Sequence, residues 1–345
     1  MANVYFSHEL IREKINSMLD TKVSMSQFMH SDDSLTAEAG MKIKIQKYVA
    51  NDNIKDVAEG EGNDDFSEVD YTEEEYEVVT TQGRTHWSDE AAMRNPIVVD
   101  TLLQGQAENM VNNLNRKAIS EMGKATKVVE CDFTTSTARY FFNKVVDALA
   151  EINASNEDES GYTLLVSPNQ QGYIRKQLGE DLRYVEDYVR TGYIGHVCGV
   201  PVVVSKAVPD SACYLVNPNA ITYFAKKGVE TETDRDKNKR ENIVYIRKVG
   251  LVALTDENYI AMLAKPQTDN VVITKPINGA AKVAGTCGQD VFKVVVSIGS
   301  KSYTAKAANG IWEVAVDAVA TGNKINAIGY AIGLAPKAAT EVTVQ

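Results

Sequence analysis

The chain has few side chains of the kinds used in catalysis or metal binding, and their spacing forms no recognisable site. Four histidines, His8, His30, His86 and His196, lie far apart in the sequence. The closest histidine–thiol pair is His196 with Cys198, which an extended strand would place on one face. Two ligands do not complete a zinc site, and a Cys–His nucleophile pair needs a third group to orient the base. We therefore expect these two residues to serve packing.

Two short segments match ligand loops only in part. The segment that begins "DRDKNKRENIVY" has Asp234, Asp236 and Asn238 at alternate positions, as in a calcium loop. However, Lys239 replaces the glycine of the turn, and Tyr245 stands where the bidentate glutamate belongs. The segment "AEGEGNDD" is too acidic to cradle a phosphate, because its carboxylates would repel the anion.

Motifs of catalytic machinery are also missing from the sequence. It contains no nucleophile elbow, Walker loop or dinucleotide fingerprint. Carboxylates in the acidic stretch would lie in water, where no burial raises a pKa for general acid catalysis. We predict no catalytic residue, no cofactor and no bound metal.

The four cysteines, Cys131, Cys198, Cys213 and Cys287, are widely spaced and form no CxxC pair. This spacing argues against a disulfide framework and against a zinc ribbon. We predict buried free thiols, because cysteine commonly acts as a small core residue.

Composition indicates a folded chain with a concentrated negative charge. The 345 residues are 44% hydrophobic and 24% charged, which allows two or three domains. The net charge is -11, and the stretch from Asp56 to Glu77 holds eleven acids and no base, so the rest of the chain is neutral. No basic stripe is available to neutralise phosphates, so direct nucleic-acid binding is not expected. The start "MANVYFSHELIREK" lacks the features of a signal peptide, and no apolar run is long enough for a membrane span.

The N-terminal third predicts an arm and a long hairpin. Residues 1–39 show no sustained periodicity, and we expect an arm ordered by contacts elsewhere. The alternation in "GMKIKIQKYVA" predicts a half-exposed strand, and "EYEVVTTQGRTHW" predicts its partner beyond the acidic tip. Little in this hairpin can be buried against its own domain, and an isolated hairpin is marginal in water. It is either a solvated loop or an arm that is buried on a neighbouring subunit.

The middle of the chain predicts a long helix followed by mixed elements. In "NPIVVDTLLQGQAENMVNNLNRKAISEM", Asn95 is the expected N-cap and Pro96 the first helical residue. An apolar stripe follows at helical spacing: Leu103, Ala107, Met110, Val111, Leu114, Ala118 and Met122. A second helix "STARYFFNKVVDALAEIN", a strand "YTLLVSP", a short helix "NQQGYIRKQLG" and a buried strand at 200–204 come next. Because no regular βαβ repeat appears, we predict an α+β fold.

The composition changes after "AKPQTDN". Residues from about 270 onward are short Val, Ala, Ile and Thr-rich strands broken by Gly and Asn. This pattern predicts a separate small β-sandwich at 268–345, with few contacts across its boundary. Its predicted core residues are Val294, Val296, Tyr303, Trp312, Val314, Val316, Ile325 and Ile328.

The order of arm, hairpin, long helix and α+β block resembles the tailed-phage major capsid proteins of the Hong Kong 97 fold. The resemblance covers residues 1–264 and rests most on "GVPVVVSKAVP", "CYLVNPNAITYFAKKGVETETD" and "VGLVALTDENYIAMLAK". It implies a capsid core at 1–267, divided into an N-arm (1–39), an E-loop (40–87), the spine helix with the peripheral domain (88–130), a mainly axial region (131–225) and a return to the peripheral domain (226–267). Residues 268–345 resemble bacterial Ig-like modules appended to phage structural proteins.

The resemblance implies a structural subunit and not an enzyme. Such a subunit assembles with itself, as hexamers and pentamers, into the icosahedral head of a virion, inside the cytoplasm of the bacterial host. It encloses double-stranded DNA without binding it specifically. Because the N-arm match begins almost at Met1, a separate scaffolding protein is implied, or a scaffold segment already removed, together with a portal. The Ig-like module would lie on the outer surface, either contacting bacterial surfaces or glycans or simply adding stability.

Two other protein classes remain open from the sequence. One is an encapsulin, in which cells use the same fold to enclose an enzyme. The other is an exported adhesin, a glycan-binding surface protein or a glycan-active enzyme with an Ig-like tail. The missing signal peptide argues against export, and the missing acid pair argues against the enzyme.

Overall fold

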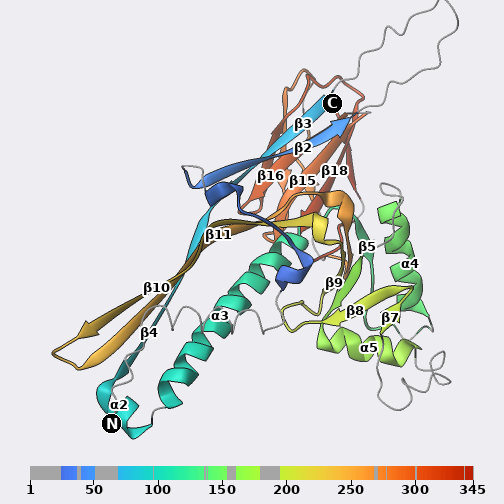
Figure 1. Cartoon of the computed structure of the whole chain (residues 1–345). Helices are drawn as coiled ribbons and strands as arrows, with labels where there is room; N and C mark the ends of the chain where they lie inside the picture. The colour runs from blue at the N-terminus through green and yellow to red at the C-terminus, as the bar shows by residue number, and fades with distance from the viewer. Residues whose placement is uncertain are drawn as a thin grey trace, which may run out of the picture. The chain divides into compact units, whose positions relative to one another are not determined.

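The structure is a computed structural model that describes residues 25–36, 40–50, 69–95, 97–135, 137, 139–153, 161–178, 195–267, 271–276, 278–299, 301–337 and 339–344 (Figure 1). Side chains of 46–50 and 69–72 are not described. Predictions for most of the N-arm, for the tip of the acidic hairpin and for linker residues 268–270 lie outside these residues. The chain divides into two compact units. The first consists of Met1–Ser26, His30–Asn113 and Thr222–Asp256, and the second of Gln27–Met29, Leu114–Ile221 and Glu257–Gln345.

The first unit is built on a four-stranded sheet with the order β1-β10-β11-β4. Its strands are β1 (His30–Asp32), β10 (Ile221–Asp236), β11 (Glu241–Leu254) and β4 (Val79–Ser88). Residues 237–240 separate the long strands β10 and β11, and Figure 1 shows β10, β11 and β4 running as one long ribbon. Strands β11 and β4 pair antiparallel from Glu241 opposite Ser88 to Gly250 opposite Val79.

The acidic hairpin is present, with strands β2 (Lys42–Ala50) and β3 (Val69–Glu77). They pair antiparallel from Lys42 opposite Glu77 to Ala50 opposite Val69. The predicted single strand "EYEVVTTQGRTHW" is instead two strands, β3 and β4, interrupted at Val78. Val78 is buried, and its N–H donates to the Met41 carbonyl, so the chain changes partners at this residue.

Two helices follow β4 and meet at a short corner. Helix α2 (Asp89–Arg94) was not expected from the sequence, and Ser88 caps it by accepting from the Ala91 N–H at 3.2 Å. Helix α3 (Ile97–Met122) confirms the predicted long helix, and the Asn95 side chain accepts from the Ile97 N–H at 3.1 Å. The predicted apolar stripe is largely buried, with Leu114 half-buried. In the first unit, α3 residues Val99, Leu103, Ala107 and Met110 form a core cluster with Val244 and Ile246 of β11.

The second unit contains a six-stranded mixed sheet with the order β5-β12-β9-β6-β8-β7. The strands are β5 (Val128–Glu130), β12 (Ile260–Ala264), β9 (Ala212–Val216), β6 (Thr163–Val166), β8 (Val200–Val204) and β7 (His196–Val197). Helices α4 (Tyr140–Asn153) and α5 (Pro168–Leu178) confirm the two predicted helices. Side chains of α4, α5 and the sheet share one apolar core. The prediction of a buried strand at 200–204 is wrong beyond Val200, because β8 is next to the edge and its outer neighbour β7 has only two residues.

Four single 3-10 turns complete the described elements: η1 (Met25–Phe28), η2 (Ser34–Thr36), η3 (Pro218–Ala220) and η4 (Glu257–Tyr259). Leu35 of η2 and Phe224 of β10 belong to a second core cluster of the first unit.

The C-terminal strands form one seven-stranded sheet with the order β13-β14-β17-β16-β15-β18-β19, in which neighbouring strands pair antiparallel. The strands are β13 (Val272–Ile273), β14 (Lys282–Thr286), β15 (Val291–Ile298), β16 (Lys301–Ala308), β17 (Ile311–Ala315), β18 (Lys324–Ala331) and β19 (Thr340–Thr343). Strand β16 pairs with β15 over most of its length and with β17 at Ala307 and Ala308. Strands from both ends of the sheet share one core around Trp312, so the sheet curls on itself.

Most predicted core residues of this domain are in that cluster. Val294, Val296, Trp312, Val316 and Ile325 are buried. Tyr303 and Val314 are partly buried against the same core. Ile328 is not in the cluster, because Ile325 and Ala327 face inward and the two-residue period of a strand turns Ile328 outward.

Candidate functional site

The described histidines lie on separate strands and are exposed. His30 begins β1, His86 is on β4, and His196 begins β7. His8 lies outside the described residues. Within the described part of the chain, no group of three His, Cys, Asp or Glu side chains could hold a metal ion.

The structure corrects the predicted placement of His196 and Cys198 on one strand face. The register pairs His196 with Pro201 and Val197 with Val200, so Cys198 and Gly199 form a two-residue turn. Both have positive φ, 53° at Cys198 and 80° at Gly199, as a type I′ hairpin turn requires. The Cys198 Sγ lies 3.7 Å from the Phe142 carbonyl oxygen, which it can reach as a donor. The Cys198 thiol therefore packs against α4. Because Cys198 is in the turn, it does not share a strand face with His196.

The four cysteines are free thiols, as predicted. Cys131 and Cys213 are buried, whereas Cys198 and Cys287 are half-buried. Burial raises the pKa of Cys131 to about 12 and that of Cys198 to about 11, and it raises the pKa values of Cys213 and Cys287 as well. A thiol with a raised pKa is protonated at neutral pH and is a poor nucleophile.

The segment that resembles a calcium loop is a strand-connecting turn. The Asp236 carboxylate accepts from the N–H groups of Asn238 and Lys239, and these bonds lower the pKa of Asp236. Asp89, at the start of α2, accepts from the Arg235 guanidinium at 2.7 Å and from the Asn242 amide at 2.8 Å. These acids hold the end of the β10–β11 hairpin against α2.

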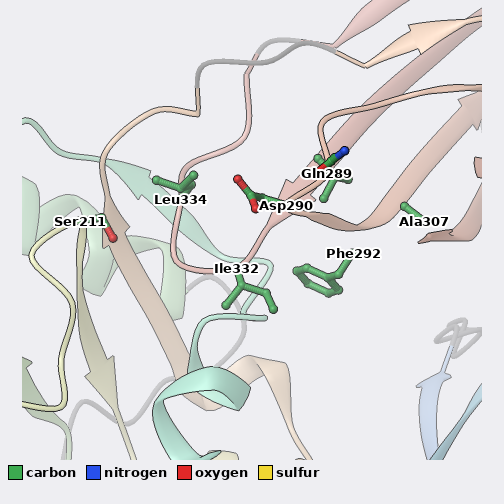
Figure 2. Close-up of a pocket in the computed structure, with 8 residues that line it drawn as sticks. Ser211, Gln289, Asp290, Phe292, Ala307, Ile332 and Leu334 are labelled. Carbon is green, nitrogen blue, oxygen red and sulfur yellow. The ribbon is translucent and has the colours of Figure 1, made fainter. Parts of the chain in front are cut away.

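One open hollow lies in the second unit, with a volume of about 530 Å³ (Figure 2). Its lining residues are Ser211, Gln289, Asp290, Val291, Phe292, Ala307, Ile332 and Leu334. Asp290 is the single carboxylate among these eight residues, and no histidine, cysteine or lysine joins it. The lining therefore provides no pair of groups for acid–base or nucleophilic catalysis.

The β2–β3 hairpin presents a charged surface, and the described side chains at its base pack against a core. Ile43, Ile45 and Tyr76 are half-buried against the cluster of Leu35, Val78, Phe224, Val249, Leu251 and Ala253. The hairpin therefore buries more apolar surface against its own unit than the sequence predicts. Met41 is exposed, although it lies on the same strand face as Ile43 and Ile45. Glu73, Glu75 and Glu77 are exposed on β3.

Lysines of the same hairpin contact these acids. Lys42 Nζ lies 2.7 Å from Glu75 Oε1 and 3.4 Å from Glu77 Oε1, and Lys44 Nζ lies 2.9 Å from Glu73 Oε2. The hydrogen bond and charge of Glu75, and then those of Glu77, raise the pKa of Lys42. Lys42 and Lys44 thus pair with acids across the register of their own hairpin. The six acids from Asp56 to Glu68 lie outside the described residues.

Exposed apolar side chains mark a second surface in the first unit. Met93 of α2 is 81% exposed and Ile97 of α3 is 68% exposed, on either side of the α2–α3 corner. These two side chains are among the most exposed large hydrophobic residues in the described part of the chain.

Comparison with known proteins identifies the class. A family model described as "Phage capsid protein" matches residues 72–264, more than half of the chain. The chain therefore belongs to the phage capsid protein family. Membership bears out the predictions of a structural protein that is not an enzyme and of a place in the virion capsid. Comparison with curated protein sequences finds no match.

Solved structures of similar fold are capsids. The capsid of Cyanophage P-SCSP1u matches with a TM-score of 0.57 and 8% identity, over 72% of this chain and 89% of that chain. The mature capsid of bacteriophage PhiM1 matches with a TM-score of 0.55 and 13% identity, over 72% and 89%. A virus-like particle from Pyrococcus furiosus matches with a TM-score of 0.53 and 10% identity, over 75% of this chain and 100% of that chain. These likenesses confirm the α+β fold of the Hong Kong 97 type.

No helix in the described ranges is long and apolar enough to cross a membrane.

Proposed function

We propose that this chain is the major subunit of the icosahedral head of a tailed phage, and that its copies assemble as hexamers and pentamers around double-stranded DNA. The observation that carries the proposal is the β2–β3 hairpin. Among the hairpin side chains that the structure describes, Ile43, Ile45 and Tyr76, at its base, pack on the core of the first unit, and the ladder of nine residue pairs extends to Ala50 and Val69. A hairpin of this kind is marginal in water, and contact with a neighbouring copy would stabilise it.

The charge of the chain supports a container for DNA. Eleven acids without a base lie between Asp56 and Glu77, and the remaining chain is neutral. A wall without a basic stripe does not retain its cargo by neutralising phosphates. A separate scaffolding protein and a portal complete the proposed set of partners.

An encapsulin-type compartment is the second candidate, because the virus-like particle from Pyrococcus furiosus has the same fold. The phage capsid family match favours the phage head. Proteins that copurify with the shells distinguish the two: DNA-packaging proteins support the phage head, and a cargo enzyme supports the compartment.

The C-terminal domain is proposed to be an Ig-like module on the outer surface of the shell. Its all-antiparallel strands and its own apolar core support such a module. A display role would bring it to bacterial surfaces or glycans. The domain boundaries given above, with the capsid core at 1–267 and the module at 268–345, belong to the same proposal.

The hairpin is tested by shortening it. Residues 51–68 are replaced by Asn-Gly, which closes a two-residue turn because Ala50 and Val69 are directly opposite. The ladder and the half-buried base remain, so we expect a folded, soluble subunit by circular dichroism. Electron microscopy should then show few or no closed shells, whereas the unmodified chain forms uniform shells. The larger deletion of 58–75, which also removes most of β3, should have the same effect.

A matched control separates length from charge. In this variant the six acids Asp56, Glu59, Glu61, Asp64, Asp65 and Glu68 become Asn or Gln at unchanged length. If assembly requires the length of the hairpin and not its charge, the amide variant assembles and the shortened variant does not. Normal shells from the shortened chain would refute the assembly role of the hairpin.

A further inference from the structure

The C-terminal domain is joined to the rest of the second unit by backbone hydrogen bonds at two places, just after the end of α3 and at residues 265–267 just before the domain begins. The Gly333 N–H donates to the Gly123 carbonyl at 3.1 Å, immediately after the end of α3. The Ala335 N–H donates to the Lys265 carbonyl at 2.8 Å, and the Ala335 carbonyl accepts from the Gln267 N–H at 2.9 Å. Pro266 and Ala335 form a parallel β-bridge. The loop after β18 therefore pairs with the residues that follow β12, and the expectation of few contacts across the boundary is not met.

Glycines make this approach possible. A Cβ at Gly123 would lie 2.8 Å from a methyl carbon of Ile332 and 3.1 Å from the Gly333 nitrogen. Gly333 has a φ of +69°, which side-chain-bearing residues rarely adopt. The end of α3 and the loop after β18 are therefore in contact at a point where neither can carry an ordinary side chain.

A buried glutamine side chain links the residues after β12 to β18. The Gln267 side chain is 5% exposed, and its Nε2 donates to the Gly329 carbonyl at 3.0 Å. A buried amide that donates across a junction fixes the geometry of both sides, because breaking the bond leaves a buried polar group unpaired.

A polar cluster forms on another side of the same junction. Glu257, in η4, accepts a hydrogen bond from Thr126 Oγ1 and lies 3.9 Å from Lys293 Nζ on β15. The side chains of Glu257 and Lys293 are only 22% and 21% exposed. Tyr330 is opposite Lys293 on β18, and burial followed by the charge of Glu257 raises its pKa. Screening by water is weaker for such partly buried charges than for the exposed pairs of the β2–β3 hairpin.

We propose that the C-terminal domain is an internal clamp, which fixes the C-terminal end of α3 and the exit of β12. The clamp consists of Gly123, Lys265 and Gln267 on the core side, and Gly329, Gly333 and Ala335 on the domain side. The pair of Glu257 and Lys293 sets its angle. A domain held at separate points in the sequence adds stability to the core and does not swing on its linker. This inference concerns contacts within one chain and is independent of shell formation.

The test is hydrogen–deuterium exchange with mass spectrometry on the full-length, unassembled subunit. Gly123→Val places a side chain against Ile332 and Gly333. The control is Gly105→Val within α3, the helix that ends just before Gly123, because a Cβ at Gly105 meets nothing within 4 Å. We expect Gly123→Val to speed exchange roughly tenfold in peptides covering 119–126, 262–267 and 330–335, because local opening sets exchange rates. Gly105→Val should leave these peptides unchanged. Equal exchange in the two variants would overturn the clamp.

A second pair of variants addresses the polar side, and it remains informative if Gly123→Val fails to fold. Lys293→Glu places a like charge beside Glu257, whereas Lys275→Glu makes the same charge change at an exposed position of the same domain. We expect roughly three- to tenfold faster exchange in the same peptides for Lys293→Glu alone. Unchanged exchange in Lys293→Glu would mean that the domain is only tethered. Because these measurements use unassembled subunits, they leave the proposed shell function untouched whichever way they turn out.

Discussion

At the scale of single residues, Gly250 shows how closely the strands of the first unit are packed. A Cβ at Gly250 would lie 2.5 Å from the Tyr223 hydroxyl and 2.8 Å from the Phe224 carbonyl oxygen. We predict that Gly250→Val destabilises the subunit by about 1–3 kcal/mol, because backbone atoms must move to admit the side chain. The measurement is the midpoint of chemical unfolding of the unassembled subunit.

Gly228→Val is the matched control for this prediction. Gly228 is on neighbouring β10, and a Cβ there meets nothing within 4 Å. Valine also favours an extended strand, so this variant should stay within about 0.5 kcal/mol of the unmodified chain. Equal losses of stability for the two variants would contradict the prediction, because crowding at Gly250 would then not set the cost.

The sequence predicted residue types better than residue directions. The free thiols and the scattered histidines followed from spacing alone. The direction of Cys198 did not, because one turn residue with positive φ removes the alternation on which the prediction depended. The prediction that Ile328 is a core residue failed for a related reason. It was based on hydrophobicity, whereas burial along β18 follows the two-residue period that begins at Ile325.

At the scale of elements, the C-terminal domain has a core that closes without the rest of the chain. Trp312, Val294, Val296 and Ile325 are all below 2% exposed and belong to one cluster. We predict that residues 268–345 alone fold as a monomer, with a cooperative thermal transition followed by circular dichroism and a sedimentation coefficient of a single small domain. Trp312→Ala should abolish that transition, because truncating a buried aromatic side chain costs about 3–5 kcal/mol. If residues 268–345 alone show no cooperative thermal transition, the prediction is wrong, and the domain depends on its contacts with the capsid core for stability.

Helices and strands with a clear hydrophobic periodicity could be predicted from the sequence, whereas the points at which one strand ends and the next begins could not. Helices α3 and α4 and the β2–β3 hairpin have strong local patterns, and all are present. The break at Val78 depends on Met41, which lies far away in sequence, so no local pattern could place it. The clamp was missed because its partners Gly123, Gly333 and Ala335 give no signal in sequence beyond their small size.

At the scale of the whole molecule, the concentration of acids predicts a dependence on salt. The β2–β3 hairpin of each subunit pairs Lys42 and Lys44 with its own glutamates, and eleven acids lie within 22 residues of sequence. We predict that the thermal midpoint of assembled shells changes between about 50 mM and 1 M NaCl, because the Debye length falls to roughly 3 Å at 1 M. Light scattering during heating provides the measurement.

The direction of that change identifies the dominant contact. A midpoint that rises with salt means that acids of neighbouring hairpins repel one another. A midpoint that falls means that ion pairs between subunits hold the shell. The full-length variant with six amides in the tip should show a flatter response. A midpoint independent of salt in the unmodified shell would show that the acidic tip faces only water.

The pairing of β4 with β11 determines when this protein can fold during its synthesis. The register places Ser88 opposite Glu241, so β4 leaves the ribosome roughly 150 residues before its partner. At a synthesis rate of about 5–20 residues per second, β4 has an unpaired edge for roughly 8–30 s before β11 is made. Open strand edges associate with other chains, and many copies of a capsid protein are made close together in one cell. The acidic stretch ends two residues before β4, so nascent chains carry like charge beside the vulnerable edge for as long as that edge remains unpaired.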